Sequence, residues 1–261
     1  MAAQSTQPRF IILYHPRIPG RAEYVRLALE AAGEPYIDLA NESKSGAREV
    51  YSRIDQNSTG DEDGNPPQFA PPMLKIQGAG KNGKALVISQ TANILLYLGS
   101  ELGLAGEDNV DKFHVNQLAL TVFDFTNEIH DSHHPLAPHL YYEDQKEEAL
   151  KKAKNFREIR LPKYLGFFER VLKGNAERGH GKYMVGSKLT YADTSAWQVI
   201  DGLRFAFPQE LKVREKDYPL IFTKFYPGIK EEKGIKEYLA SGRRIPYSNG
   251  VFRYYPELDR Q

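Results

Sequence analysis

The spacing of apolar residues changes along the chain, from short continuous runs near the start to helical stripes later. Residues 10–14 (FIILY) form a continuous apolar run, which is typical of a strand buried on both faces. Residues 21–32 repeat apolar side chains at helical spacing, and Gly33 is a suitable helix end. Residues 36–39 predict a second strand, parallel to the first, so the pattern indicates a β-α-β unit.

The next part of the chain is polar and then returns to apolar runs. Residues 41–69 are rich in turn formers, and 57–67 (NSTGDEDGNPP) predict a loop. Two short apolar runs at 73–76 and 85–88, joined by a Gly-rich turn, predict a hairpin. A helix is expected from about Ser89 onward.

After about residue 106 the pattern becomes helical. Four apolar residues share one helical stripe: Leu118, Val122, Phe125 and Ile129. Residues 142–160 predict a charge-rich helix, which we expect Pro162 to end or kink because proline lacks an N–H. Thr190 and Asp193 have the spacing of a capping box at the start of a further helix. The whole pattern predicts a small α/β domain followed by a larger all-α domain.

Composition narrows the classes of function. The chain has 261 residues, enough for one large domain or two ordinary ones. Its formal net charge is +1, from 35 Lys and Arg against 34 Asp and Glu, so no basic excess indicates a nucleic-acid partner. There is no cysteine, which excludes disulfides and a protein thiol nucleophile.

The sequence also bears on location. The first ten residues (MAAQSTQPRF) lack the basic and apolar regions of a secretory signal. No apolar run reaches the roughly 18 residues that a membrane-spanning helix needs. We therefore expect a cytoplasmic protein that does not enter a membrane.

Four motifs, in this order and spacing, resemble the cytosolic glutathione transferases, nearest the tyrosine-using mu, pi and sigma classes. They are Tyr14 followed by GRAEYVR, PPMLKI at 71–76, SQTANILLYLGSELGL at 89–104, and the YMVGSKLTYADTSAWQV segment. The resemblance implies a thioredoxin-like, glutathione-binding domain over 8–104 and an all-helical domain over 110–261. The second domain would contribute a hydrophobic substrate site, and the protein would form a homodimer.

The expected chemistry is ionisation of the glutathione thiol. A free thiol with a pKa of about 8.5 is mostly protonated at neutral pH, and lowering that pKa by about two units makes the thiolate dominant. The resemblance makes Tyr14 the donor to sulfur; otherwise it is a core residue that ends a strand. The loop HPRIP has five residues where the family carries four, so His15 or Arg17 is the alternative group near sulfur.

Other positions are assigned to glutathione by resemblance. Gln90 and Thr91 would hold the γ-glutamyl carboxylate at a helix N-terminus, or simply cap the helix. Arg21 would reach the same end of the tripeptide, or would be solvated and paired with an acid such as Glu49. Asp124 would cross a dimer interface to the partner's γ-glutamyl amine, or belong to a solvated face.

The PPM segment corresponds to the family's cis-proline region. Pro71, Pro72 and Met73 would line the cysteinyl part of glutathione, and the cis bond precedes either Pro71 or Pro72. Pro71 has no N–H, so one of the two backbone hydrogen bonds expected there is lost if Pro72 is the cis residue. Lys44 and Arg48 are candidates for the glycine carboxylate.

The second substrate is expected to be an apolar electrophile. Its contacts would come from His15, Ile18, Phe123 and His133, although a core position is the alternative for Phe123. The clustered histidines at 130–139 do not indicate a metal site, because the chain has neither cysteine nor an HExxH motif. Residues 243–261 form either a lid over the cleft or a solvated tail.

The resulting prediction is a glutathione S-transferase that conjugates glutathione to apolar electrophiles, with no metal. Two alternatives remain. One is a glutathione-dependent isomerase or an enzyme with one dedicated substrate. The other is a non-catalytic glutathione- or ligand-binding protein on the same fold.

Overall fold

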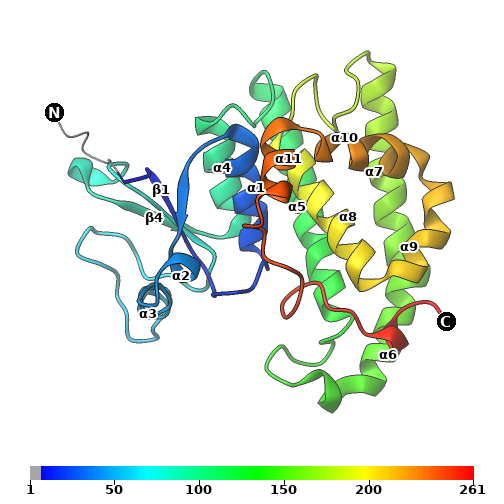
Figure 1. Cartoon of the computed structure of the whole chain (residues 1–261), viewed down its shortest axis with the longest axis horizontal. Helices are drawn as coiled ribbons and strands as arrows, with labels where there is room; N and C mark the ends of the chain where they lie inside the picture. The colour runs from blue at the N-terminus through cyan, green and yellow to red at the C-terminus, as the bar shows by residue number, and fades with distance from the viewer. Residues whose placement is uncertain (1–6) are drawn as a thin grey trace.

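The computed structural model describes residues 7–261, and its first part is a four-stranded mixed sheet (Figure 1). The strands are β1 (Phe10–Leu13), β2 (Tyr36–Asp38), β3 (Met73–Ile76) and β4 (Leu86–Ser89). Their order is β2-β1-β3-β4, with β1 and β2 parallel and the other two pairs antiparallel. The predicted β-α-β unit and hairpin are both confirmed.

Helices cover both faces of the sheet. On one face lie α1 (Ala22–Ala32) and α4 (Thr91–Glu101), and on the other α2 (Leu39–Glu42) and α3 (Gly46–Arg53). The turn-rich pattern of 41–69 gave no indication of α2 and α3, which precede the predicted loop at 57–67. Each buries only one or two residues, so no helical stripe is visible in the sequence, and tertiary packing rather than propensity holds them.

The remainder of the described chain is helical. Its α-helices are α5 (Asn109–Asp131), α6 (Lys146–Asn155), α7 (Leu161–Glu177), α8 (Tyr191–Ala206), α9 (Pro208–Arg214), α10 (Tyr226–Lys230) and α11 (Lys233–Ala240). Helix α8 lies at the centre, with α5 on one side and α1 on another (Figure 1). The predicted fold class, an α/β thioredoxin-like part followed by an all-α part, is confirmed. Within residues 7–261, no helix has the length and hydropathy of a membrane span.

Two predictions about helix ends, at Pro162 and at Thr190, have different outcomes. Pro162 does not end its helix: a π-helical turn, Phe156–Arg160, precedes it and joins α6 to α7 without a break. Such a turn accommodates the missing hydrogen bond of the proline. The capping box is present as predicted: the Asp193 carboxylate accepts the Thr190 N–H at 2.8 Å, and the Thr190 side chain accepts the Asp193 backbone N–H.

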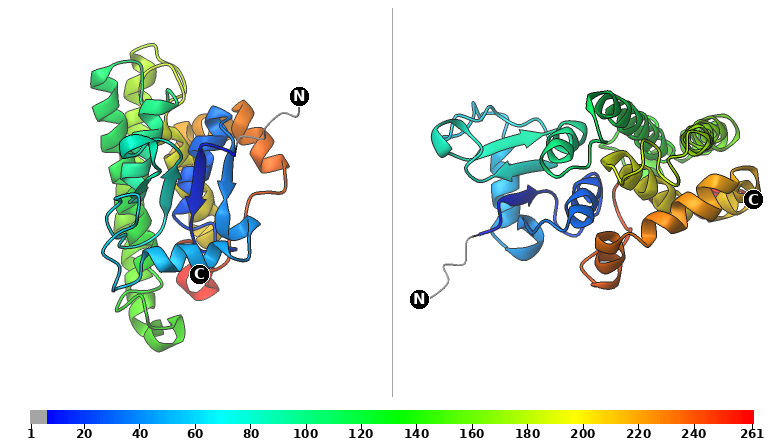
Figure 2. Two further views of the ribbon diagram at one scale, coloured as in Figure 1. Left: turned by 90° about the vertical axis from the view of Figure 1, so that its left-hand side faces the viewer. Right: turned by 90° about the horizontal axis from the view of Figure 1, so that it is seen from above.

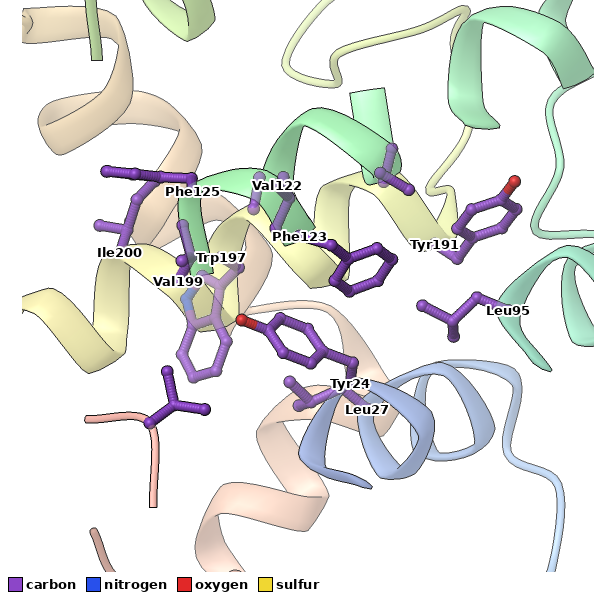
Figure 3. Close-up of a cluster of buried hydrophobic side chains, with 14 of the residues drawn as sticks. Tyr24, Leu27, Leu95, Val122, Phe123, Phe125, Tyr191, Trp197, Val199 and Ile200 are labelled. Atoms are coloured by element: carbon purple, nitrogen blue, oxygen red, sulfur yellow. The ribbon is translucent and has the colours of Figure 1, made fainter. Parts of the chain in front are cut away.

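The α/β part and the helical part share one continuous core (Figure 3). Tyr24 on α1 points into it, where its ring lies edge-on to Phe123 at 5.2 Å between centroids. The Tyr24 hydroxyl hydrogen-bonds Thr126 on α5 at 2.7 Å. Because an aromatic contact and a buried hydrogen bond both hold α1, its N-terminus is fixed relative to α5.

Residues 243–261, here called the C-terminal strap, run from the junction with the α/β part across the helical part to the C-terminus beside α6 (Figure 1, red). Phe252 packs on Gly202 of α8, where any side chain would collide with its ring. Tyr255 stacks on Tyr142 at 3.7 Å between centroids. Asp259 accepts the N–H groups of the first turn of α9. The strap is therefore docked and is not a solvated tail.

The strap covers two histidines that follow α5. The exposed fractions of His133 and His134 are 2% and 5%, and the His133 Nε2–H donates to the Val251 carbonyl at 2.9 Å. Their Nδ1 atoms contact each other. Burial lowers the pKa of His133 to about 3 and that of His134 to about 4.

Acid should therefore weaken the fold. Unfolded histidine has a pKa of about 6.5, so between that value and about 4 the unfolded chain binds more protons than the folded one. We expect the urea midpoint to be constant above about pH 6.5 and to fall as the pH decreases toward 5. The double variant His133→Gln, His134→Gln should show a shallower slope over that window. If the urea midpoint fell equally steeply with decreasing pH in both proteins, His133 and His134 would not be the groups that cause the loss of stability.

Candidate active site

Three segments leave the sheet at the same edge. Leu13 of β1 pairs with Met73 of β3, and Met73 pairs with Ser89 of β4. Tyr14, Pro72 and Gln90, the neighbours of these three residues, therefore lie side by side. With about 4.8 Å between strands, the row spans about 10 Å, which is the length of an extended tripeptide.

Tyr14 directs its hydroxyl at the start of α1. The side chain is 7% exposed, and its oxygen accepts the Arg21 N–H at 3.0 Å. Gly20 is required beside it, because a Cβ at that position would collide with the hydroxyl and because its φ is +44°. Since the oxygen already accepts a hydrogen bond, the hydroxyl proton remains available to donate.

The electrostatics keep Tyr14 a neutral donor. Burial raises its pKa above the ordinary tyrosine value, while the Arg21 N–H and the charges of Arg21 and Arg26 oppose that shift. A phenol with a raised pKa stays protonated at neutral pH. It can therefore donate to an anion but cannot act as a base.

The HPRIP loop accommodates its extra residue at a point away from the Tyr14 hydroxyl. Arg17 has a φ of +60°, which is uncommon outside glycine, and its N–H donates to Asn41 Oδ1 of α2 at 2.7 Å. His15 is half-buried, with Nδ1 3.4 Å from the Tyr51 hydroxyl of α3. The loop thus bulges toward α2 and α3, and the Tyr14 hydroxyl still reaches α1.

The N-terminus of α4 has a residue with an uncommon backbone conformation, Gln90, and a buried hydroxyl without a partner among residues 7–261, that of Thr91. Gln90 is exposed and has a φ of +69°, a conformation that costs about 1–3 kcal/mol and often marks functional positions. Thr91 is 4% exposed, and within residues 7–261 its Oγ1 has no hydrogen-bond partner. An anion at this helix end would pair with the hydroxyl and with free backbone N–H groups.

The cis peptide bond joins Pro71 to Pro72. Pro72 and Met73 are buried and Pro71 is half-buried. Of the two alternatives left by the sequence, the cis bond therefore precedes Pro72, so the residue before it offers a carbonyl but no N–H.

Arg21 extends toward α5. Its Nη2 donates to Asn127 Oδ1, and Glu49 instead pairs with Arg53 at 3.2 Å and with Lys75 at 3.5 Å. Asp124 is exposed on α5, one turn before Asn127. No local pattern marks Asn127 as a partner, because the contact joins positions that are 106 residues apart.

The residues predicted for the second substrate are not all accessible. Ile18 is half-buried, and a Cβ on Gly250 of the strap would lie 3.1 Å from its Cγ2. Phe123 lies in the shared core and His133 beneath the strap, with exposed fractions of 7% and 2%. The loop after Tyr14 thus lies against the strap. No group of acids and histidines among residues 7–261 has the arrangement of a metal site.

Comparisons with known proteins agree with this arrangement. Residues 130–242 match the family model described as "Glutathione S-transferase, C-terminal domain". A glutathione S-transferase of Plasmodium falciparum is 25% identical over 84% of this chain and 93% of its own length. Glutathione S-transferase P 1 of Xenopus laevis is 27% identical over 91% and 94%, respectively.

A solved structure supports the fold. The sigma-class glutathione transferase of Fasciola hepatica superposes with a TM-score of 0.66, covering 93% of this chain and all of the other, at 20% identity. The family match, the full-length relatives and the shared fold lead to one conclusion. The chain is similar to glutathione transferases in its C-terminal part, along most of its length and in its fold.

Proposed function

We propose that this protein conjugates glutathione to apolar electrophiles and that Tyr14 stabilises the thiolate. One observation carries the proposal: the Tyr14 hydroxyl accepts the Arg21 N–H at 3.0 Å and so presents its own proton at the sheet edge. Glutathione would enter as a co-substrate, with its cysteinyl sulfur near Tyr14. Its backbone would lie along Pro71, Pro72 and Met73.

The thiolate forms because three groups favour the charged sulfur. The Tyr14 O–H donates to it, and the Arg21 N–H polarises that hydroxyl. The N-terminus of α1 adds a partial positive charge. Lowering the thiol pKa by about two units needs about 2.7 kcal/mol of differential stabilisation, which a hydrogen bond to an anion can largely provide. The thiolate then attacks the electrophile and forms a C–S bond.

The γ-glutamyl carboxylate is assigned to the N-terminus of α4. The unpaired Thr91 hydroxyl fits this group, because a buried donor without a partner is costly until a ligand supplies one. Gln90 would add a side-chain contact, and Arg21 would lie at the same end of the tripeptide. Asp124 and the glycine-carboxylate candidate Lys44 remain predictions; both are exposed.

We expect Thr91→Val to weaken glutathione binding while leaving the chemical step nearly unchanged. A hydrogen bond to a charged group contributes about 1.5–3 kcal/mol, so KM for glutathione should rise about 10- to 100-fold with kcat within about twofold. Steady-state kinetics with varied glutathione measure both constants.

Two variants serve as controls for Thr91. Thr91→Ser keeps the hydroxyl and should retain most of the affinity. Thr121→Val removes a hydroxyl that bonds the Gln117 carbonyl at 3.0 Å on α5 and should leave KM unaltered. If Thr91→Val behaves like Thr121→Val, the carboxylate does not bind here.

A cytoplasmic homodimer is also part of the proposal. Apolar side chains protrude from the loop before β3 and from α5, with exposed fractions of 89% for Phe69, 74% for Phe113 and 47% for Leu120. Large exposed apolar side chains, such as Phe113 and Leu120 two turns apart on α5, favour a protein partner. Sedimentation equilibrium at micromolar concentration should give about twice the chain mass of 29.7 kDa; a monomer would refute the dimer.

A further inference from the structure

The C-terminal strap passes close to the Tyr14 hydroxyl. After α11 it runs beside α1 and reaches the loop that joins β1 to α1 (Figure 1 and Figure 2). A Cβ on Gly250 would lie 3.1 Å from Ile18 Cγ2 and 3.9 Å from the Gly20 Cα. Gly20 in turn packs on the Tyr14 hydroxyl, with which a Cβ at that position would collide. A short series of contacts thus joins the strap to the group that is proposed to bind sulfur.

Arg253 is held at this part of the strap with most of its donors unused. Its Nε–H donates to the Gly250 carbonyl at 3.1 Å, and its side chain is half-buried. In the part of the chain that the structure describes, its two Nη groups have no hydrogen-bond partner and no carboxylate lies within 4.0 Å of them. The Nη groups of Arg253 are therefore available to a molecule bound beside the Tyr14 loop.

The end of α5 gives a second indication of where Arg253 lies. His130 is one turn beyond Asn127, which accepts the Arg21 Nη2–H. Burial lowers the pKa of His130, and the charges of Arg253 and Arg21 lower it further, while Asp131, 3.5 Å from its Nδ1, opposes the shift. Because the effect of a charge weakens with distance, both guanidinium groups lie near this imidazole. His130 is neutral at pH 7, so the positive charge on the strap side is that of Arg253.

In the proposed complex, this place is on the open side of the glutathione sulfur. Tyr14, Pro72 and Gln90 lie in that order along the sheet edge, so Tyr14 is at the opposite end of the row from Gln90. With the γ-glutamyl group at the N-terminus of α4, the tripeptide covers the Pro72 side of Tyr14. An electrophile then reaches the sulfur from the side of the loop and the strap, where the Arg253 Nη groups are.

The chemistry of the second substrate gives these donors a task. When a thiolate adds to an enone, the C–S bond forms at the β-carbon and the π electron pair moves to the carbonyl oxygen. The enolate lasts until water protonates the α-carbon. A positioned N–H group beside the oxygen where this charge develops lowers the barrier. Arginine suits the task because it stays charged at every pH at which the enzyme works.

We propose that Arg253 is a further catalytic residue, whose Nη groups donate to the oxyanion that develops on the electrophile as the thiolate attacks. The inference rests on the proposed function, because it needs the thiolate that Tyr14 stabilises. The two roles are separate: Tyr14 acts on the sulfur, and Arg253 acts on the far end of the electrophile. The favoured substrates are therefore enones, enals and nitroarenes, which place charge on oxygen, rather than alkyl halides, which do not.

The test compares benzylideneacetone, an enone, with hexyl iodide, using the full chain at saturating glutathione. Arg253→Gln should lower kcat/KM for the enone about 10- to 100-fold, less than the full cost of a donor in a closed site because Arg253 is only half-buried. The value for hexyl iodide should stay within about twofold, since its iodide leaves without an oxyanion. Arg253→Lys keeps the charge and should recover part of the loss.

Two further variants separate this role from the others. Tyr14→Phe should slow both electrophiles by a similar factor. Arg178→Gln removes the same charge at an exposed position at the end of α7 and should slow neither. If Arg253→Gln slows both electrophiles equally, or slows neither, Arg253 does not contact the oxyanion and only this inference is wrong. If the wild type binds glutathione but conjugates neither electrophile, the proposed function fails, and this inference fails with it.

Discussion

Tyr14→Phe is expected to lower kcat/KM for conjugation by about 10²- to 10³-fold, the effect of removing one preorganised donor to a developing or stabilised anion. The ring would remain in its buried position, so the fold should be retained. Without the hydroxyl, only the helix end and nearby charges favour the thiolate. The pKa of bound glutathione should then rise by about two units, toward that of the free thiol.

The pH dependence of conjugation to an aryl halide measures this shift, and thiolate absorbance of the bound complex checks it independently. His15→Gln is the control: it alters the neighbouring side chain, which faces Tyr51, and should leave the profile unchanged. If Tyr14→Phe had the kcat/KM and pH profile of the wild type, Tyr14 would be a core residue and not the donor to sulfur. A wild type that binds glutathione but does not conjugate it would favour the isomerase or the ligand-binding alternative.

Glu23→Ala is expected to lower the free energy of unfolding by about 3–5 kcal/mol, the usual cost of removing one partner from a buried ion pair. Glu23 is fully buried and lies 3.1 Å from both Arg26 and Arg244. It also accepts the Tyr238 hydroxyl at 3.2 Å. Its loss leaves two guanidinium groups and a phenol partly unsatisfied in the interior.

Urea unfolding followed by circular dichroism measures this cost. Glu23→Gln keeps the shape and some hydrogen bonds, so its stability should be intermediate. Glu231→Ala removes a fully exposed pair with Lys236 and should not change the midpoint measurably. If Glu23→Ala were as stable as Glu231→Ala, the network would contribute nothing to the link between α1 and the strap.

The elements of the fold that could be predicted are those that depend on patterns of neighbouring residues in the sequence. The β1–α1–β2 unit, the hairpin, the stripe of α5 and the capping box of α8 each depend on residues within a few positions of one another. Glu23 shows the limit of such patterns. It stands in the conspicuous GRAE segment, but the partners that bury it, Tyr238 and Arg244, come from more than 200 residues later.

The candidate site also contains residues that the sequence could predict and residues that it could not. Tyr14 ends a predicted strand, Pro72 precedes one and Gln90 follows one closely, so sheet register alone can bring the three together. The contacts of Asn41 with the loop and of Asn127 with Arg21 depend on the packing of α2 and α5, for which a lone asparagine gives no signal. His133 and Phe123 show the converse: both are suitable for a substrate wall by residue type, yet tertiary packing buries them.

The contact between Gly250 and Ile18 also has a consequence for synthesis. A ribosome makes the Tyr14 loop early and the strap more than 220 residues later. At about 5–20 residues per second, the loop exists for roughly ten seconds or more before the strap can dock against it. The nascent chain should therefore expose the Tyr14 loop and the apolar surface under the strap, so chaperones or proteases have access to both until the last residues dock.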